Sequence, residues 1–521
     1  SSHAWLAMPS PTDLADVLSC LTRLVNSRWM NGRKLAQVLS ATGFASQSRM
    51  AASYSPEAWN AAKSIESDIR EWLRSHRQAV DKDALLYIEE HISKNRQSPF
   101  GQFYILYKIH KPRTPRGFPT RPVCSDVSSL PHALGKWVDT QLQPIARAQP
   151  SYFQDSYSLK QLLSEIDVPP HALLFTADAK SMYTNIRTGP ALTHISNLIR
   201  HEAGRSFHHY DTHALTDALQ IVFKNNILKF GDTYWRQISG TGMGIAPAPP
   251  WATIYYAIHE NRILPRWSSN ILFYRRFIDD VIGIWTCDVC PERNNMLWTS
   301  FQLDMQQWYG MEWEFSPLSR TCNYMDLTLT ITGRSIHSTL FEKPHNLYLY
   351  LPPHSSHPKG PLQSLIFGNI LRIHRLCSTQ HEIRKHTRAF HHRLTNRGYH
   401  TAVITPIFHK ATKNAIAYTS RTAIEQATRQ HMLTSKTDKT VFFHLQFHPQ
   451  DPTARDLQQA WQQTVATPPN DVPLSNLKNI DGINVPIQSL TIAYSCPTNL
   501  RNQFSIQNIE NRGRAVSTYL N

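Results

Sequence analysis

The chain of 521 residues carries 54 lysine and arginine side chains against 38 aspartate and glutamate side chains, a formal charge of +16 before its 26 histidines are counted. This basic excess favours a polyanionic partner, nucleic acid before a membrane surface. No apolar run approaches the roughly 20 residues that a membrane-spanning helix needs, and the N-terminus lacks the pattern of a signal peptide. Seven scattered cysteines are typical of a reducing compartment. The composition therefore argues against a membrane protein, a disordered chain and a disulfide-stapled secreted domain.

The first 95 residues are predicted to be helical. Apolar residues recur at helical spacing between 14 and 25, behind a capping pair at 12–13, and again after Pro56. The second apolar face is expected to be buried and consists of Ala62, Ile65, Ile69, Trp72 and Leu73. Neither helix carries a pattern that indicates chemistry.

Residues 103–123 are predicted to form a β-hairpin with a stiff, basic tip, because two apolar strands flank a loop rich in Lys, Arg, Pro and Gly. Such a loop is often merely solvated. The alternative is a clamp on phosphates, in which Arg121 grips two oxygens at once while Lys108 and Lys111 act as point charges.

A further strand, beginning near residue 173, ends at Asp178 and is followed by a turn and a predicted helix. The end of a strand is where an α/β sheet exposes its ligands. An isolated aspartate in this place is often only a helix cap. Asp178 becomes a candidate metal ligand only if a second carboxylate lies near it.

Residues 273–285 supply that candidate, because Asp279 and Asp280 interrupt two apolar runs that are predicted to pair as strands. No Asn-Gly or Gly-Gly lies between the runs, so the acids are expected in the turn or directly beside it. A pair of aspartates in a turn is usually solvated. Here the two charges repel unless a cation lies between them. A two-metal site for phosphoryl transfer needs carboxylates from neighbouring strands, with ions about 4 Å apart.

The remaining stretches organise the chain around these carboxylates. The glycines at 240–244 do not form a P-loop, and the prolines at 249–250 start a helix that is apolar nearly all round. A second hairpin is expected over 323–341, basic helices over 371–393, and two strands with a helix between them after residue 440. Neither the lone CxxC at 287–290 nor the histidines between 345 and 392 have the partners of a zinc site, so free thiols and no zinc are predicted.

Six sequence blocks occur in a fixed order. DAKSMYTNI at 178–186 and YRRFIDD at 274–280 resemble the first catalytic block and the catalytic hairpin of reverse transcriptases of the Penelope-like retroelement class. The other blocks similar to that family are YKIHKP at 107–112 with RPV at 121–123, GTGMG at 240–244, YMDLTL at 324–329, and HP at 357–358 with LRIHRLCS at 371–378. The resemblance covers residues 103–378 and continues weakly over 441–504, where NLR at 499–501 is similar to the closing segment of the family.

This resemblance implies an α+β multidomain fold with the right-hand architecture of a polymerase. It places a helical N-terminal region at 1–95, fingers at 96–165, a palm with the catalytic carboxylates at 166–345, a basic helical thumb at 346–435 and a small α/β extension at 436–521. It also implies an RNA-directed DNA polymerase that extends a DNA primer with dNTPs on an RNA template. The partners are therefore nucleic acids and nucleotides rather than a membrane, and the nucleus is the expected compartment.

The resemblance implies two Mg²⁺ ions, for which Mn²⁺ can substitute. Their implied ligands are Asp178, Asp279, Asp280 and the backbone carbonyl of Ala179, with Asp279 bridging and Asp280 supporting less directly. The implied nucleotide-binding residues are Lys108, Lys111, Arg121, Tyr183 and Gly244, and the implied nucleic-acid contacts are Arg275, Arg276, Arg372 and Arg375. Tyr183 is expected under the incoming sugar, where its ring excludes a 2′-hydroxyl; the alternative is a core tyrosine.

The sequence departs from the family in two places. IAP at 245–247 stands where the family usually carries Thr-Pro and another residue in its glycine block. The sequence also ends without the GIY-YIG nuclease module that the family often carries, so strand cleavage is not expected. Two alternatives remain: an inactive scaffold that binds nucleic acid, and a polymerase that copies DNA or makes RNA. The three intact aspartates argue against the first, and Tyr183 argues against RNA synthesis.

Overall fold

The computed structural model describes residues 56–96, 98–107, 120–202, 211–230, 233–237, 240–344, 346–355, 360–420, 440–446, 452–466 and 489–495. They fall into two compact units that divide between Leu347 and Tyr348. Four parts of the sequence prediction lie outside the described residues: the helix at 14–25, the hairpin tip with Lys108 and Lys111, and the blocks at 357–358 and 499–501. Among the described helices, none has the length and hydropathy to cross a membrane.

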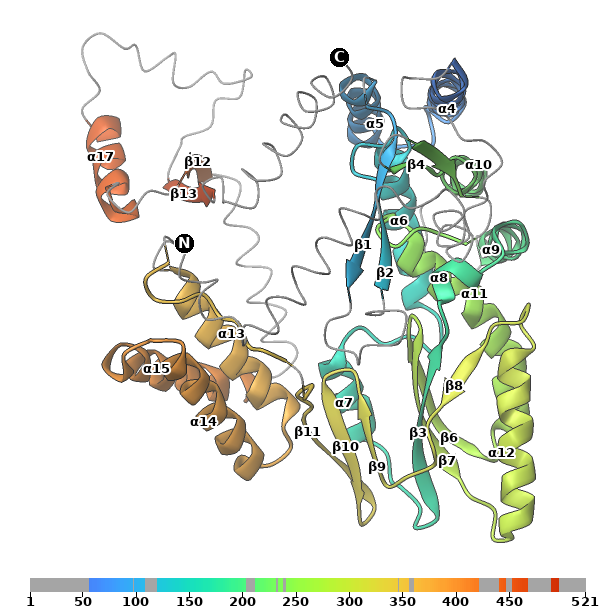
Figure 1. The fold of residues 1–521 in the computed structure, drawn as a ribbon, viewed down its shortest axis with the longest axis vertical. Helices are drawn as coiled ribbons and strands as arrows, with labels where there is room; N and C mark the ends of the chain where they lie inside the picture. Colours follow the sequence, from blue (N-terminus) through green and yellow to red (C-terminus); the bar gives the residue numbers. More distant parts are fainter. Residues whose placement is uncertain are drawn as a thin grey trace, which may run out of the picture. The chain divides into compact units, whose positions relative to one another are not determined.

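The first unit is built around an antiparallel sheet in the strand order β6-β7-β3-β8 (Figure 1). Its strands are β6 (Ile271–Phe277), β7 (Asp280–Thr286), β3 (Ala172–Ala179) and β8 (Trp313–Phe315). The strand that ends near Asp178 and the hairpin that carries the paired aspartates are thereby confirmed. Ile278 and Asp279 alone join β6 to β7, and Ile278 has a φ of 56°. This left-handed conformation lets the chain reverse within two residues without a glycine.

An aromatic layer covers one face of this sheet. Helix α12 (Pro291–Gln306) runs along the sheet (Figure 1) and packs Trp298 and Phe301 against Phe175 of β3, with ring centroids 5.0 and 5.8 Å apart. Gly283 lies opposite Phe175 in the strand register, and a Cβ there would come within 2.3 Å of the Phe175 ring. The glycine in β7 therefore makes room for an aromatic ring in β3.

A second sheet, in the order β2-β1-β4-β5, belongs to the same unit. Its strands are β1 (Gly101–Tyr107), β2 (Thr120–Ser125), β4 (Ile227–Phe230) and β5 (Thr233–Arg236). Residues 102–107 of β1 pair antiparallel with β2, as predicted for the basic hairpin. This sheet therefore presents Arg121, the described cation of the hairpin, on an edge strand.

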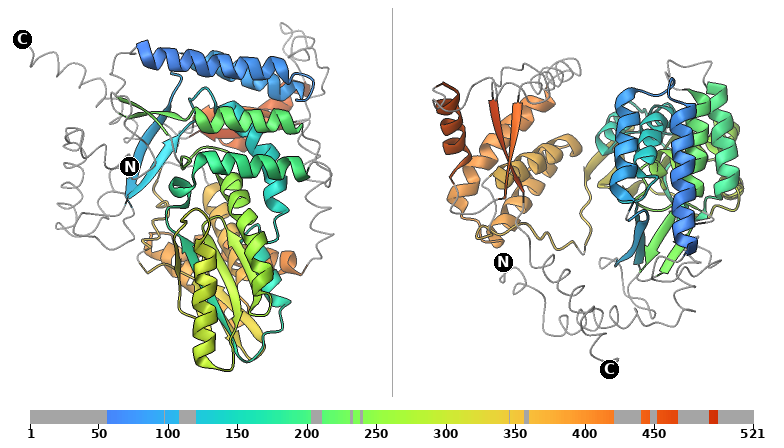
Figure 2. Two further views of the ribbon diagram at one scale, coloured as in Figure 1. Left: turned by 90° about the vertical axis from the view of Figure 1, so that its right-hand side faces the viewer. Right: turned by 90° about the horizontal axis from the view of Figure 1, so that it is seen from above.

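The same unit contains a set of helices, several of which lie side by side (Figure 2). They are α4 (Pro56–Ser75), α5 (Lys82–Asn95), α6 (His132–Arg147), α7 (Ser156–Ser164), α8 (Met182–Asn185), α9 (Thr188–Glu202), α10 (Thr212–Lys224), α11 (Ala248–Ile263) and the 3₁₀ turn η1 (Leu264–Trp267). The five apolar residues predicted to face the core from α4 are all buried. Helix α11 is buried nearly all round and begins with two prolines, as predicted.

The second predicted hairpin is a three-stranded sheet, β9 (Thr321–Tyr324), β10 (Leu327–Thr332) and β11 (Ser335–Leu340). The prediction of a simple two-stranded hairpin over 323–341 is therefore wrong, because its first half divides into β9 and β10. Met325 has a φ of 51° and, with Asp326, turns the chain between β9 and β10. Period-2 alternation continues through this turn, so the sequence pattern did not reveal it.

In the second unit, the helices α13 (Gly360–Leu376), α14 (Gln380–Asn396) and α15 (Thr401–Thr419) follow one another along the chain. They share a core to which Ile370, Phe390 and Phe408 contribute. Thr379 caps α14 by accepting a hydrogen bond from the Glu382 N–H. Strands β12 (Thr440–Gln446) and β13 (Ser489–Ser495) pair in parallel, and helix α17 (Ala454–Ala466) lies between them in sequence. The α+β class is thus confirmed for the described residues.

Candidate active site

Three aspartates meet at one end of the sheet β6-β7-β3-β8. The strand register sets Asp178 opposite Asp280, so their side chains leave the same face of the sheet. Asp279 occupies the turn before β7, and its carbonyl accepts a hydrogen bond from the Ala179 N–H at 2.9 Å. The structure therefore brings together the three carboxylates that the sequence predicts.

The carboxylates repel one another strongly. The pKa of Asp280 is raised to about 7, first by burial, then by the charges of Asp279 and Asp178, and by a hydrogen bond with the Asp178 side chain. Two carboxyl groups can share a hydrogen bond only if one of them holds a proton. A cation between them would supply the same compensation as that proton.

Arg121 lies close enough to Asp279 to act on its charge. Burial raises the pKa of Asp279 and the charge of Asp178 raises it further, whereas Arg121 and Arg276 lower it. Arg121 is exposed, and it stands on β2, in a different sheet from the carboxylates. The structure thus places one predicted phosphate-binding cation near the acids. Lys108 and Lys111 lie outside the described residues.

Tyr183 stands beside Asp279. It belongs to α8, the short helix that follows β3, and it is half-buried against the core. Burial raises its pKa, and the charge of Asp279 raises it further. The ring therefore packs on the core and also interacts with the carboxylate cluster, and its predicted place under the sugar stays a prediction.

The glycine block, residues 240–244, packs between the hairpin β1–β2 and α8. Gly244 has a φ of +123°, and a Cβ there would lie 2.5 Å from the Cys124 carbonyl oxygen of β2. The Cys124 N–H donates to the Met243 carbonyl at 2.7 Å, and the Thr241 N–H donates to the Tyr183 carbonyl at 2.6 Å. The glycines thus allow backbones to approach closely, and the predicted nucleotide contact of Gly244 stays a prediction.

The prediction that Arg276 contacts nucleic acid is wrong. Its side chain is 0% exposed, and its Nε lies 2.6 Å from the Glu260 Oε1. Arg275, its neighbour, is half-buried; it donates from Nη1 to the Tyr274 carbonyl at 2.8 Å and lies over the Phe273 ring. Adjacent strand residues face opposite sides of a sheet, so only one of the two arginines could point outward.

Three further residues act on the site and were not predicted. The exposed Lys343, which follows β11, lowers the pKa of Asp280. The Tyr324 hydroxyl donates to the Asp280 carbonyl at 2.7 Å. Glu260 pairs with Arg276 beneath the turn. Two of these residues had a signal in the sequence. Tyr324 opens the block YMDLTL at 324–329, and Glu260 is an acidic residue within the apolar helix α11.

The donor chemistry fits a divalent cation, because carboxylate oxygens are preferred ligands of Mg²⁺. Within the described parts of the chain, no group of three or more His, Cys, Asp or Glu side chains is arranged to hold one ion in common. An ion would therefore be held by two carboxylates together with a backbone carbonyl and water or substrate oxygens. Cys287 and Cys290 are both free thiols.

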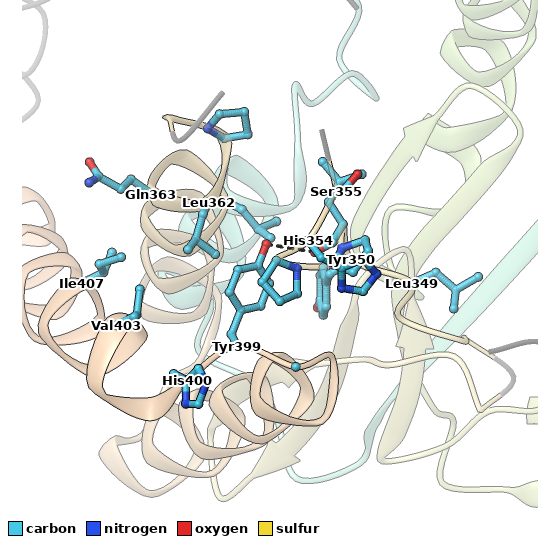
Figure 3. Close-up of a pocket in the computed structure, with 16 residues that line it drawn as sticks. Leu349, Tyr350, His354, Ser355, Leu362, Gln363, Tyr399, His400, Val403 and Ile407 are labelled. Atoms are coloured by element: carbon cyan, nitrogen blue, oxygen red, sulfur yellow. Dashed lines mark hydrogen bonds between the residues drawn. The ribbon is translucent and has the colours of Figure 1, made fainter. Parts of the chain in front are cut away.

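The second unit holds the other predicted nucleic-acid contacts. Arg372 is exposed on α13, whereas Arg375 is half-buried and lies 5.8 Å from the Tyr418 ring centroid. A groove of about 970 Å³ in this unit is lined mainly by apolar side chains, and Figure 3 shows Leu362 and Tyr399 among them. The Tyr399 hydroxyl donates to the Leu351 carbonyl at 2.9 Å.

Residues 349–409 match the animal helix-turn-helix domain family, which covers α13, α14 and the start of α15. No curated protein matches the sequence. Among solved structures, the chain is similar to telomerase from Candida albicans, solved with a TWJ fragment of telomeric RNA, at 11% identity and a TM-score of 0.41 over 64% of this chain and 62% of that one. It is also similar to the RNA-dependent RNA polymerase of BmCPV at its elongation state, at 13% identity and a TM-score of 0.39 over 60% of this chain and 28% of that one. At these scores neither likeness assigns a role to a residue of this chain.

Proposed function

We propose that the chain is a template-directed nucleic-acid polymerase, and specifically an RNA-directed DNA polymerase that extends a primer 3′-hydroxyl with dNTPs. The observation that carries the proposal is the meeting of Asp178, Asp279 and Asp280 where β3 ends and β7 begins. Arg121 near Asp279 and Tyr183 beside it support the proposal. The resemblance of the blocks at 178–186 and 274–280 supports an RNA template and the nucleus as the compartment.

Asp178 and Asp279, with the Ala179 carbonyl, would hold two Mg²⁺ ions, and Asp280 would support them. Bound there, the ions would lower the pKa of the primer hydroxyl and neutralise charge on the leaving pyrophosphate. The repulsion among the three aspartates is then relieved by the ions rather than by a shared proton. The cluster is costly to the fold without such a ligand, which argues against a purely structural role.

The other residues position the nucleotide. Arg121 would donate to triphosphate oxygens, since a guanidinium matches two of them at once. Tyr183 would lie under the sugar and leave no space for a 2′-hydroxyl, which selects dNTPs. Fixing the reactants and stabilising charge supply most of the rate enhancement in phosphoryl transfer, so Arg121 and the aspartates should dominate the kinetics.

Primer extension tests the proposal directly. A labelled DNA primer on an RNA template and on a DNA template would be incubated with the purified chain, dNTPs and Mg²⁺ or Mn²⁺. We expect product on the RNA template, and a loss of more than about 100-fold for Asp279→Asn, because even the partners of metal ligands are worth 10–100-fold.

Asp83→Asn is the matched control, since Asp83 is an exposed carboxylate of α5. It should extend the primer like the wild type. Equal product from Asp279→Asn and the wild type would rule out the assignment. Tight binding of template and primer without any product would indicate a scaffold, and product on the DNA template alone would indicate a DNA-copying enzyme.

A further inference from the structure

We propose that Arg276 and Glu260 are positioning residues, a buried pair that fixes the turn carrying Asp279. The proposal rests on the proposed function for the identity of the bound ion. Nothing in the sequence blocks assigns this task to the pair, and the second arginine of YRRFIDD was expected to contact nucleic acid.

The pair is held rigidly in the interior of the first unit. Arg276 donates from Nε to Glu260 Oε1 at 2.6 Å and from Nη2 to Glu260 Oε2 at 2.9 Å. The Tyr274 hydroxyl donates to Oε1 and the Ser151 hydroxyl to Oε2, both at 2.6 Å. Every oxygen of the carboxylate is thereby satisfied by two donors. Both charged side chains are 0% exposed, so water does not compete for these bonds.

The same guanidinium also reaches the turn. Arg276 donates from Nη1 to the Ile278 carbonyl at 2.8 Å and from Nη2 to the Thr253 carbonyl at 2.9 Å. Ile278 is the residue with a φ of 56°, directly before Asp279. A β-branched residue in the left-handed region is strained and persists only where its surroundings hold it. Arg276 thus connects helix α11, through Glu260 and Thr253, to the strained residue of the turn.

Arg276 donates one of three hydrogen bonds that hold successive backbone carbonyls of the turn. The carbonyl of Ile278 accepts from Arg276, the carbonyl of Asp279 from the Ala179 N–H, and the carbonyl of Asp280 from the Tyr324 hydroxyl. The donors come from three segments of the chain. A carboxylate on a two-residue turn has few other constraints, and ligands must be fixed by their supporting contacts to bind a metal well.

A purely structural role and a positioning role for Arg276 and Glu260 predict different effects of a lysine at position 276. If the pair only compensates buried charge, a lysine at 276 preserves that compensation. If it positions the turn, a lysine fails, because one ammonium cannot span Glu260, Thr253 and the Ile278 carbonyl as the planar guanidinium does. The two roles therefore separate in Arg276→Lys and in the charge-free double variant Glu260→Met with Arg276→Met.

The experiment measures binding of Mn²⁺ alone to the full chain by titration calorimetry, alongside the melting temperature without metal. Arg276→Lys should weaken Mn²⁺ binding by about tenfold, at the lower end of what the hydrogen-bond partners of metal ligands contribute. The titration is run below the melting temperature of the variant, which should fall because buried acceptors of Arg276 lose their donors. The double variant should also bind Mn²⁺ about tenfold more weakly. If it fails to fold, Arg276→Lys decides the question.

Trp72→Phe is the control for general destabilisation. It removes a buried hydrogen bond from Trp72 Nε1 to the Ala214 carbonyl at 2.9 Å and should leave Mn²⁺ affinity unchanged. An Mn²⁺ affinity within twofold of the wild type for Arg276→Lys would overturn the proposal, as would a wild type that does not bind Mn²⁺. If the wild type binds Mn²⁺ but extends no primer, the proposed polymerase function is contradicted, whereas the positioning role of the pair is not.

Discussion

Asp279 and Asp280 are neighbours in sequence but occupy different parts of the hairpin. Asp280 lies in β7 opposite Asp178 and shares a hydrogen bond with it, whereas Asp279 lies in the turn. Because the Asp280 pKa is raised to about 7, a neutral amide can imitate its protonated form. We predict that Asp280→Asn retains measurable primer extension while Asp279→Asn loses it.

Single-nucleotide incorporation rates at saturating Mg²⁺ check this order of severity. Asp178→Asn, which removes the other proposed ligand, should behave like Asp279→Asn. The prediction is contradicted if Asp280→Asn is as inactive as these two, and the bridging role would then pass to the opposed pair Asp178 and Asp280.

A prediction about the choice between ribonucleotides and deoxyribonucleotides concerns Tyr183. Its half-buried ring interacts with Asp279, so truncation should open space beside the carboxylates. We predict that Tyr183→Ala raises incorporation of ribonucleotides relative to deoxyribonucleotides, and that Tyr183→Phe leaves the ratio unchanged because the ring remains. The ratio of the two kcat/KM values in primer extension measures this. An unchanged ratio in Tyr183→Ala would mean that the tyrosine is only a core residue.

The sequence alone identified the three candidate aspartates, but it did not show which of the two adjacent arginines is buried. A carboxylate inside an apolar strand pattern is conspicuous, and Asp178, Asp279 and Asp280 could be found on that basis. Arg275 and Arg276 are adjacent and have the same side chain. The alternation of strand residues between the two faces of a sheet shows that one of them faces inward, but it does not show which one. The answer depends on Glu260, which lies on a different element and meets Arg276 only in the folded chain.

At the scale of elements, the glycine block joins β2 to α8 through close backbone contacts. Gly244→Ala would bring a Cβ within 2.5 Å of the Cys124 carbonyl oxygen at a φ of +123°. Gly310 also has a positive φ, +74°, but no atom lies within 4 Å of its Cβ position. Gly310→Ala should therefore cost only the conformational term of about 1–2 kcal/mol.

We predict that Gly244→Ala destabilises the chain by more than Gly310→Ala and also raises the KM for dNTPs, because the block lies against Tyr183. Denaturant unfolding and primer-extension kinetics measure the two effects. Equal stability losses in the two variants would show that β2 moves aside easily.

The buried pair that links α11 to β6 should make stability depend on pH. Burial alone would raise the pKa of Glu260, but the charge and hydrogen bonds of Arg276 outweigh it and hold the pKa below its usual 4.5. A carboxyl with a lowered folded-state pKa stabilises the fold above its unfolded-state pKa. That contribution is lost as the pH falls below about 4.5 through the folded-state value.

We predict that Glu260→Gln is destabilised by about 3–5 kcal/mol at neutral pH, because Arg276 is left buried without a counter-charge. The difference from the wild type should shrink below pH 4.5, where the wild type loses the same interaction. Melting temperatures across this range measure it. A difference that is constant with pH would mean that Glu260 is not charged in the fold.

Element prediction succeeded where hydrophobic periodicity is long and failed where a turn lacks its usual residues. Helix α4 and the strands around Asp178 were found from spacing alone. The turn at Met325, like the one at Ile278, uses a positive φ without glycine. Such turns are held by tertiary contacts, and a single sequence does not record them. Around Asp279 these contacts are the hydrogen bonds from Arg276 to the Ile278 carbonyl and from Tyr324 to the Asp280 carbonyl.

At the scale of the whole molecule, the formal charge of +16 predicts how nucleic acid is bound. Cations that contact phosphates release counterions, so the logarithm of the binding constant should fall linearly with the logarithm of salt concentration, with a slope of about 0.9 for each phosphate contact to a duplex. Arg372 is exposed on α13, among other basic side chains. We predict that Arg372→Gln reduces the salt slope by about 1, measured by fluorescence anisotropy with a primer–template duplex.

Arg334→Gln is the matched control for this loss of charge. Arg334 is exposed, is ion-paired with Asp167 and lies between β10 and β11, outside the helices that are expected to contact nucleic acid, so its loss should leave the slope unchanged. Asp279→Asn should also keep the slope, because it removes a carboxylate and no cation. A slope reduced equally by Arg372→Gln and Arg334→Gln would mean that net charge alone, and not a contact of α13, governs the binding.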